Sequence, residues 1–86
     1  MFSIIEQYMT KLTKEDVYNF AIKKNCILDD NECEFTYNFI KKNWQAILFN
    51  KGIFNINKYR NHYSEENFKK IKSIYEEYFY KFAKFL

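Results

Sequence analysis

The sequence predicts an all-α protein, a small four-helix domain in which three N-terminal helices pack against a long C-terminal helix. Three observations predict this class. The 86 residues include one glycine and no proline, whereas tight β-hairpins need residues that accept positive φ or preset φ. Apolar residues recur at helical spacing in four stretches. Residues that can cap a helix precede most of these stretches, and a chain of this length forms one domain, residues 1–86.

The first helix is expected near residues 3–11. Its apolar side chains follow the i, i+3, i+4, i+7 spacing of one helix face: Ile5, Tyr8, Met9 and Leu12. Glu6 interrupts the short apolar stretch at the N-terminus before a signal-peptide core could form. No apolar run approaches the ~18 residues that a membrane helix needs. We therefore expect a cytoplasmic protein.

A second helix is expected near residues 14–24. Thr13 can accept hydrogen bonds from the free N–H groups at its start, and Glu15 and Asp16 suit the positive end of the helix dipole. Asn25 can end the helix in a left-handed turn. Only a narrow polar strip interrupts its apolar residues, so we expect the most enclosed helix of the fold here: Val17, Tyr18, Phe20, Ala21 and Ile22.

The third helix is expected near residues 30–49, after the apolar link Cys26-Ile27-Leu28, which should fill part of the core. Asp29 or Asp30 is expected to cap it. Its apolar stripe repeats at intervals of four and three residues: Cys33, Tyr37, Ile40, Trp44 and Ile47. The acidic stretch at its start does not match a calcium loop, because Cys33 and Glu34 occupy positions of an oxygen ligand and of the required glycine.

The last helix is expected near residues 65–85, starting at Ser64, after a packed connector at 53–63 with room for one short helical turn. Its apolar residues keep a spacing of three and four: Phe68, Ile71, Tyr75, Tyr78, Phe82 and Phe85. Four residues at the centres of the predicted stripes are expected to form the core: Phe20, Ile40, Trp44 and Ile71.

The residues that could carry chemistry form no catalytic, metal or nucleotide motif. His62 lies beside Tyr63 and near Arg60, but a lone histidine without an adjacent nucleophile is usually a solvated side chain. Cys26 and Cys33 are too few for a disulfide framework, and with a single histidine they make no zinc set. We therefore expect a non-enzymatic protein with reduced thiols, no cofactor and no metal site.

The abundance of aromatic residues indicates an interaction surface. The chain contains 10 Phe, 8 Tyr and 1 Trp, more rings than so small a domain can enclose. Four of them lie close to the C-terminus, with little chain beyond to cover them: Tyr78, Phe79, Phe82 and Phe85. The leading prediction is a protein-protein interaction module of unknown partner, or a homo-oligomer, that uses these four residues. Packing of the same residues against the first three helices is the other interpretation.

A basic region offers a second interpretation. Residues 1–37 carry 4 lysines against 7 carboxylates, whereas residues 38–86 carry 10 basic residues against 4 carboxylates. Basic and aromatic residues alternate within 41–72, and this pattern can contact phosphates and stack on unpaired bases. The alternative function is therefore weak, sequence-tolerant nucleic-acid binding, with these candidate contacts: Lys41, Lys42, Lys58, Arg60, Lys69 and Lys70. With 13 Lys and one Arg, the bidentate contacts of specific readout are nearly absent.

The order of elements supports one resemblance. A short helix, Leu12-Thr13, a helix, Asn25 with Ile27-Leu28, a helix, a connector and a final helix follow one another. In this order the chain resembles the YqfT-like family of small uncharacterised proteins from low-GC Gram-positive bacteria. The resemblance implies an all-α fold and no known activity, and it assigns no site residues.

Overall fold

The structure is all-helical in the part of the chain it describes. The computed structural model describes residues 2–49 and 55–83, and side chains at 4–47 and 55–77. In these residues the elements are α1 (Phe2–Lys11), α2 (Lys14–Lys23), α3 (Asp30–Phe49), the 3-10 helix η1 (Ile56–His62) and α4 (Glu65–Ala83). None of these helices is both long enough and apolar enough to cross a membrane. The all-α prediction is confirmed.

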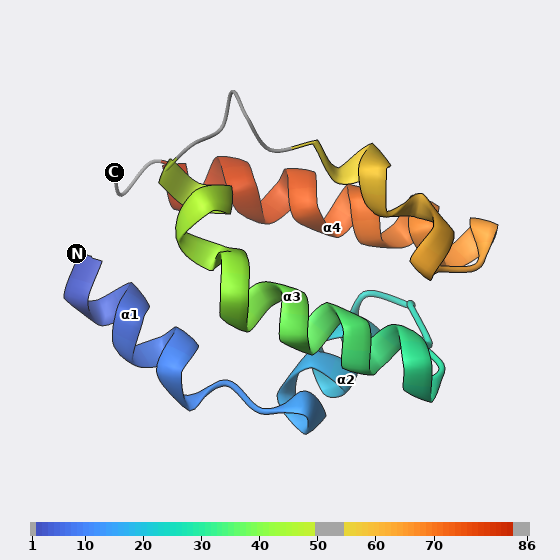
Figure 1. The fold of residues 1–86 in the computed structure, drawn as a ribbon, viewed down its shortest axis with the longest axis horizontal. Helices are drawn as coiled ribbons and strands as arrows, with labels where there is room; N and C mark the ends of the chain where they lie inside the picture. The colour runs from blue at the N-terminus through green and yellow to red at the C-terminus, as the bar shows by residue number, and fades with distance from the viewer. Residues whose placement is uncertain (1, 50–54, 84–86) are drawn as a thin grey trace.

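The central element is α3. It contacts α1, α2 and α4, while η1 packs against α4. Figure 1 shows α3 running through the middle of the molecule, with α4 and η1 on one side and α1 and α2 on the other. The predicted four-helix arrangement, with α4 as the common partner, is therefore not confirmed, since the described residues form five helical segments, of which α3 is the central one.

Local capping sets the helix boundaries. The Thr13 hydroxyl accepts from the backbone N–H of Asp16, and the Asp16 carboxylate accepts from the N–H of Thr13, each at 3.0 Å. Asn25 has a φ of 63°, so it ends α2 in the expected left-handed turn. The Ser64 hydroxyl accepts from the N–H of Asn67 at 3.1 Å and starts α4. These three cap predictions are confirmed.

The core is built around the link between α2 and α3. Five buried residues form one cluster: Val17, Ala21, Cys26, Leu28 and Cys33. Half-buried side chains from α3 and α4 pack against it, Ile40 and Ile71 among them. The link fills the core as predicted through Cys26 and Leu28, which are 0% and 3% exposed, but Ile27 is 70% exposed.

The prediction that α2 is the most enclosed helix is wrong. Only Val17 and Ala21 of α2 are buried, whereas Tyr18 and Ile22 are 37% and 42% exposed. The reason is that α2 packs mainly against α3, and one neighbour covers only one face of a helix. The second apolar face of α2 is left on the surface.

The predicted core residues lie at the border of the core. Phe20, Ile40, Trp44 and Ile71 are half-buried, and Ile40 and Ile71 pack against the buried cluster. Periodicity identifies the inward face of each helix but not how deeply each position is covered. A tryptophan such as Trp44 is in any case rarely enclosed completely, because of its size.

Aromatic side chains of the connector pack against aromatic side chains of α3. The ring of His62 stacks on Phe35 at 3.7 Å between centroids, with 5° between the planes. Tyr59 meets Phe39 at 4.5 Å, edge to face. Such pairs stabilise by about 0.5–1.5 kcal/mol beyond the area they bury. Within the described residues 55–63 the connector is therefore packed as expected, and the predicted helical turn is η1.

Candidate functional site

A buried carboxylate joins the beginnings of two helices. Glu32 is 4% exposed. Its Oε1 accepts from the N–H of Asp29 at 2.9 Å, and Asp29 Oδ1 accepts from the N–H of Glu32 at 2.7 Å, so the two residues form a capping box on α3. Its Oε2 accepts from the N–H of Ser64, the residue that caps α4, at 2.7 Å. One side chain thus ties the N-termini of α3 and α4 together.

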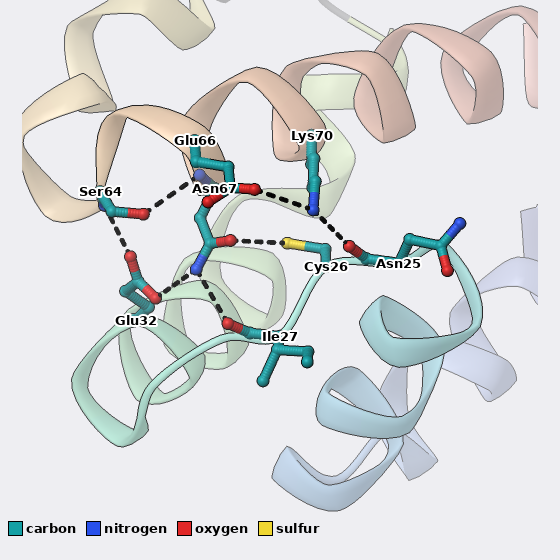
Figure 2. Close-up of polar contacts among 8 residues, drawn as sticks. All are labelled: Asn25, Cys26, Ile27, Glu32, Ser64, Glu66, Asn67 and Lys70. Atoms are coloured by element: carbon teal, nitrogen blue, oxygen red, sulfur yellow. Dashed lines mark hydrogen bonds and ion pairs between the residues drawn. The ribbon is translucent and has the colours of Figure 1, made fainter.

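Asn67 connects this carboxylate to the link. Its Nδ2 donates to Glu32 Oε1 at 2.8 Å and to the carbonyl oxygen of Ile27 at 2.9 Å. Its Oδ1 accepts from the thiol of Cys26 at 3.7 Å. Figure 2 shows these contacts converging on one amide. We call Cys26, Ile27, Glu32, Ser64 and Asn67 the Asn67 clamp.

Two lysines add further ties between α4 and the end of α2. Lys70 Nζ donates to the carbonyl oxygen of Asn25 at 2.7 Å and pairs with Glu66 at 3.5 Å. Lys24 Nζ pairs with Glu77 at 2.8 Å. Glu66 and Lys70 are one turn apart on α4, whereas Glu77 reaches across to the residue that follows α2. The chain from Lys24 to Ile27 is consequently held to α4.

The two cysteines act as buried thiols. Burial raises the pKa of Cys26, although the positive charge of Lys70 opposes the shift. Burial also raises the pKa of Cys33, whose Sγ donates to the carbonyl oxygen of Lys14 at 3.5 Å. Both sulfurs therefore keep their protons at neutral pH and serve as weak hydrogen-bond donors.

Tyr63 closes the network on its other side. Thr36 donates its only hydroxyl proton to the carbonyl oxygen of Glu32 at 2.7 Å. The contact of 2.6 Å between Thr36 Oγ1 and Tyr63 Oη therefore has Tyr63 as its donor. Burial raises the pKa of Tyr63 to about 12, and the nearby charge of Glu32 acts in the same direction. The hydrogen bond with Thr36 acts in the opposite direction and lowers the pKa of Tyr63. To donate to a deprotonated Tyr63, the Thr36 hydroxyl would have to break its hydrogen bond with the carbonyl oxygen of Glu32.

The clamp presents an apolar side chain to solvent. The carbonyl of Ile27 is fixed by Asn67, while its side chain is 70% exposed. In Figure 2 that side chain points away from the polar contacts. Tyr18 and Ile22, one turn apart on α2, are exposed as well. This combination of a fixed backbone and exposed apolar side chains is the candidate binding surface.

The predicted C-terminal surface lies largely outside the described residues. Tyr78, Phe79 and Phe82 belong to the helical backbone of α4, but their side chains are not among those described. Phe85 lies beyond the described range. The role of these four residues stays a prediction.

The predicted basic residues fall into two groups. Lys41 donates to the carbonyl oxygens of Met9 and Thr10 at 3.0 and 2.8 Å, where a cation suits the negative end of the α1 dipole. Lys70 is held by Asn25 and Glu66. These two are thus engaged within the fold, while the other four candidates are exposed: Lys42, Lys58, Arg60 and Lys69.

Glu32 belongs to the acidic stretch at the start of α3. The Asp29-x-x-Glu32 spacing is a recognisable capping box. No local pattern indicates Asn67, because its partners come from distant parts of the chain. Among the described residues, no group of three His, Cys, Asp or Glu is arranged to hold a metal ion.

Comparison with family models, with curated proteins and with solved structures finds no match. The resemblance to the YqfT-like family stays a prediction based on residue spacing.

Proposed function

We propose that this protein is a non-enzymatic protein-protein interaction module. The observation that carries the proposal is the exposed apolar surface of Tyr18, Ile22 and Ile27. Single exposed apolar residues are ordinary. These three, however, lie close together in the chain, with Tyr18 and Ile22 one turn apart on α2 and Ile27 in the link after the end of that helix. Exposed apolar residues gathered in this way on a small domain are typical of a site that another protein covers.

The hydrogen bonds behind the surface support the same proposal. Binding loses affinity when a loop must first be ordered. Here the link is fixed by hydrogen bonds from Asn67 to Ile27 and from Lys70 to Asn25. A partner would therefore meet a surface whose backbone is already in place.

The C-terminal aromatic residues remain part of the proposal. Because α4 runs to Ala83, Tyr78 and Phe82 continue the spacing of Ile71 and Tyr75 along one helix. Two such helices from two copies can pair symmetrically, so a homodimer is the simplest partner arrangement. Covering even about 400 Å² of apolar surface stabilises by about 10 kcal/mol before association entropy is subtracted, which leaves moderate affinity.

Phe82→Asp combined with Phe85→Asp tests this self-association. We expect the wild-type protein to associate at high micromolar concentration and the double variant to stay monomeric with unchanged helix content. Buried charges would disrupt the pairing, whereas charges that face solvent would leave the helix intact. Sedimentation equilibrium and circular dichroism provide the measurement. Gln45→Asp with Asn57→Asp adds the same charge at exposed positions and serves as control. A monomeric wild-type protein together with an unfolded double variant would assign the four residues to the core instead.

A second candidate function is weak, sequence-tolerant nucleic-acid binding through the basic 41–72 region. One observation favours it. Because η1 packs against α4, the exposed Lys58 and Arg60 lie on a segment that contacts the helix carrying the exposed Lys69. The Arg60 guanidinium lies 5.0 Å from the centroid of the Phe68 ring, so packing also positions one of these cations.

Lys58→Glu combined with Arg60→Glu tests the second candidate. If the region contacts phosphates, affinity should fall steeply with salt, and the double variant should bind every sequence more weakly by the same factor. Fluorescence anisotropy with labelled oligonucleotides measures both effects. Absence of binding to single- and double-stranded DNA and RNA at about 50 mM salt, where such contacts are strong, would exclude this function.

A further inference from the structure

The exposed face of α2 borders a groove at the beginning of α3. Its volume is about 560 Å³. Leu28 and Cys33 line it and are each 3% exposed, so they form its floor, and the more exposed Tyr18 forms a wall. We call this feature the Tyr18 groove.

Hydrogen bonds fix the position of the two residues that form the floor of the Tyr18 groove. Cys33 Sγ donates to the carbonyl oxygen of Lys14, which joins α3 to the first turn of α2. Leu28 follows Ile27, whose carbonyl oxygen accepts from Asn67. The groove therefore has a fixed shape before any partner binds, and a fixed shape favours affinity.

The rim of the groove is negatively charged. Glu15, Asp29 and Asp30 line it together with a single cation, Lys14. Lys14 Nζ pairs with Asp30 at 2.8 Å, and no ion pair among the described residues engages Glu15 or Asp29. The N-termini of α2 and α3 each contribute only about half a positive charge. Two carboxylates are therefore left without a full countercharge beside an apolar floor.

We propose that the Tyr18 groove binds a basic segment of a partner protein. One apolar side chain of that segment packs against the exposed Tyr18 ring, over the nearly buried Leu28 and Cys33, and flanking Lys or Arg residues pair with Glu15 and Asp29. This inference rests on the proposed function and specifies the chemistry of the partner. The charge of the rim decides between classes of partner, because a nucleic acid or an acidic segment would be repelled there.

Two model peptides of opposite charge test the proposal. One is a short, fluorescently labelled amphipathic peptide of leucine and lysine, and the other has glutamate in place of every lysine. In fluorescence anisotropy we expect the lysine peptide to bind at least about tenfold more tightly, and its affinity to fall with rising salt. Tyr18→Ala should weaken binding about tenfold by removing the apolar wall.

Charge reversal at the rim supplies the second readout. Glu15→Lys should weaken binding of the lysine peptide about fivefold to tenfold, because it replaces an attraction by a repulsion. Glu65→Lys reverses a matched exposed carboxylate in the first turn of α4, and Tyr8→Ala removes a matched exposed ring from α1. Both controls lie outside the groove and should leave affinity within about twofold.

Each contrary result has a distinct meaning. Equal binding of both peptides, still weakened by Tyr18→Ala, would overturn the basic partner while the interaction function stands. The groove would be overturned as a docking site if neither peptide binds, or if Tyr18→Ala and Glu15→Lys leave the affinity of the lysine peptide unchanged. Sedimentation of the wild-type protein tests the proposed function separately. If Glu15→Lys also abolishes self-association, the occupant is the basic half of a second copy, which overturns the assignment to another protein.

Discussion

Glu32→Gln is expected to lower the free energy of unfolding by about 3 kcal/mol, because hydrogen bonds to a charged group contribute about 1.5–3 kcal/mol each. The Glu32 carboxylate accepts from the N–H groups of Asp29 and Ser64 and from the side-chain amide of Asn67. All three partners are donors. A glutamine retains one acceptor oxygen but turns its own NH₂ group toward a donor, so at least one bond is lost and one repulsive contact is gained.

Urea denaturation followed by circular dichroism measures this loss. Glu34→Gln is the matched control, since Glu34 lies on the same helix and is exposed. Removing its charge should change stability by no more than about 0.5 kcal/mol. If the Glu32 and Glu34 variants unfold at the same urea concentration, the capping box and the hydrogen bond from Ser64 to Glu32 contribute little to stability.

Alkaline pH is expected to destabilise the protein through Tyr63. In the unfolded chain this phenol should lose its proton near its ordinary pKa of 10.0, whereas burial raises its pKa to about 12 in the folded protein. Between these values the unfolded chain binds fewer protons than the folded one, so stability falls as the pH rises. A shift of this size corresponds to about 3 kcal/mol of stability, fully present below pH 10 and lost by about pH 12.

Tyr63→Phe separates the effect of Tyr63 on the pH dependence of stability from the effects of other groups that titrate at alkaline pH. Burial also raises the pKa values of Cys26, Cys33 and Tyr75, so these groups also favour unfolding at high pH. The variant should be less stable at neutral pH because Thr36 loses a hydrogen bond, but its stability should decline less between pH 10 and 12. Urea titrations at several pH values give the slopes. Identical slopes for the variant and the wild-type protein would place Tyr63 in contact with solvent.

Helix boundaries could be predicted because their signals are local. Thr13 with Asp16, Asn25, and Ser64 act on backbone groups within three or four residues, so the sequence shows cap and partner together. The predicted end of the second helix at residue 24 differs from the observed Lys23 by one position, which is the usual uncertainty of a helix end.

The depth of burial could not be predicted from periodicity. The sequence places Tyr18 and Ile22 in an apolar helix, yet both are exposed, while Cys26 in the link is fully buried. The position of a residue along its own helix determines which face of the helix it occupies. How deeply the residue is buried depends on which neighbouring element packs against that face. The central position of α3, which leaves part of α2 open, is a property of the tertiary arrangement.

The candidate site could be predicted least. The abundance of aromatic residues led to a prediction at the C-terminus, where the side chains lie outside the described residues, and it gave no indication of the exposed Ile27. The Asn67 clamp joins segments that are distant in sequence, and such contacts leave no short-range pattern. Likewise, two of the basic candidates, Lys41 and Lys70, prove to be bound to backbone carbonyl oxygens.

The central claim is that Glu32 joins the beginnings of α3 and α4 and so fixes the surface that the link presents. Amide hydrogen exchange by NMR tests it most directly, because the N–H groups of helix-capping residues ordinarily exchange fast unless a tertiary contact holds them. In the wild-type protein the amides of Asp29 and Ser64 should both be protected by the one carboxylate, and in Glu32→Gln both should exchange faster together. A Ser64 amide that exchanges at the unprotected rate in the wild-type protein, or that is unaffected by Glu32→Gln, would contradict the account.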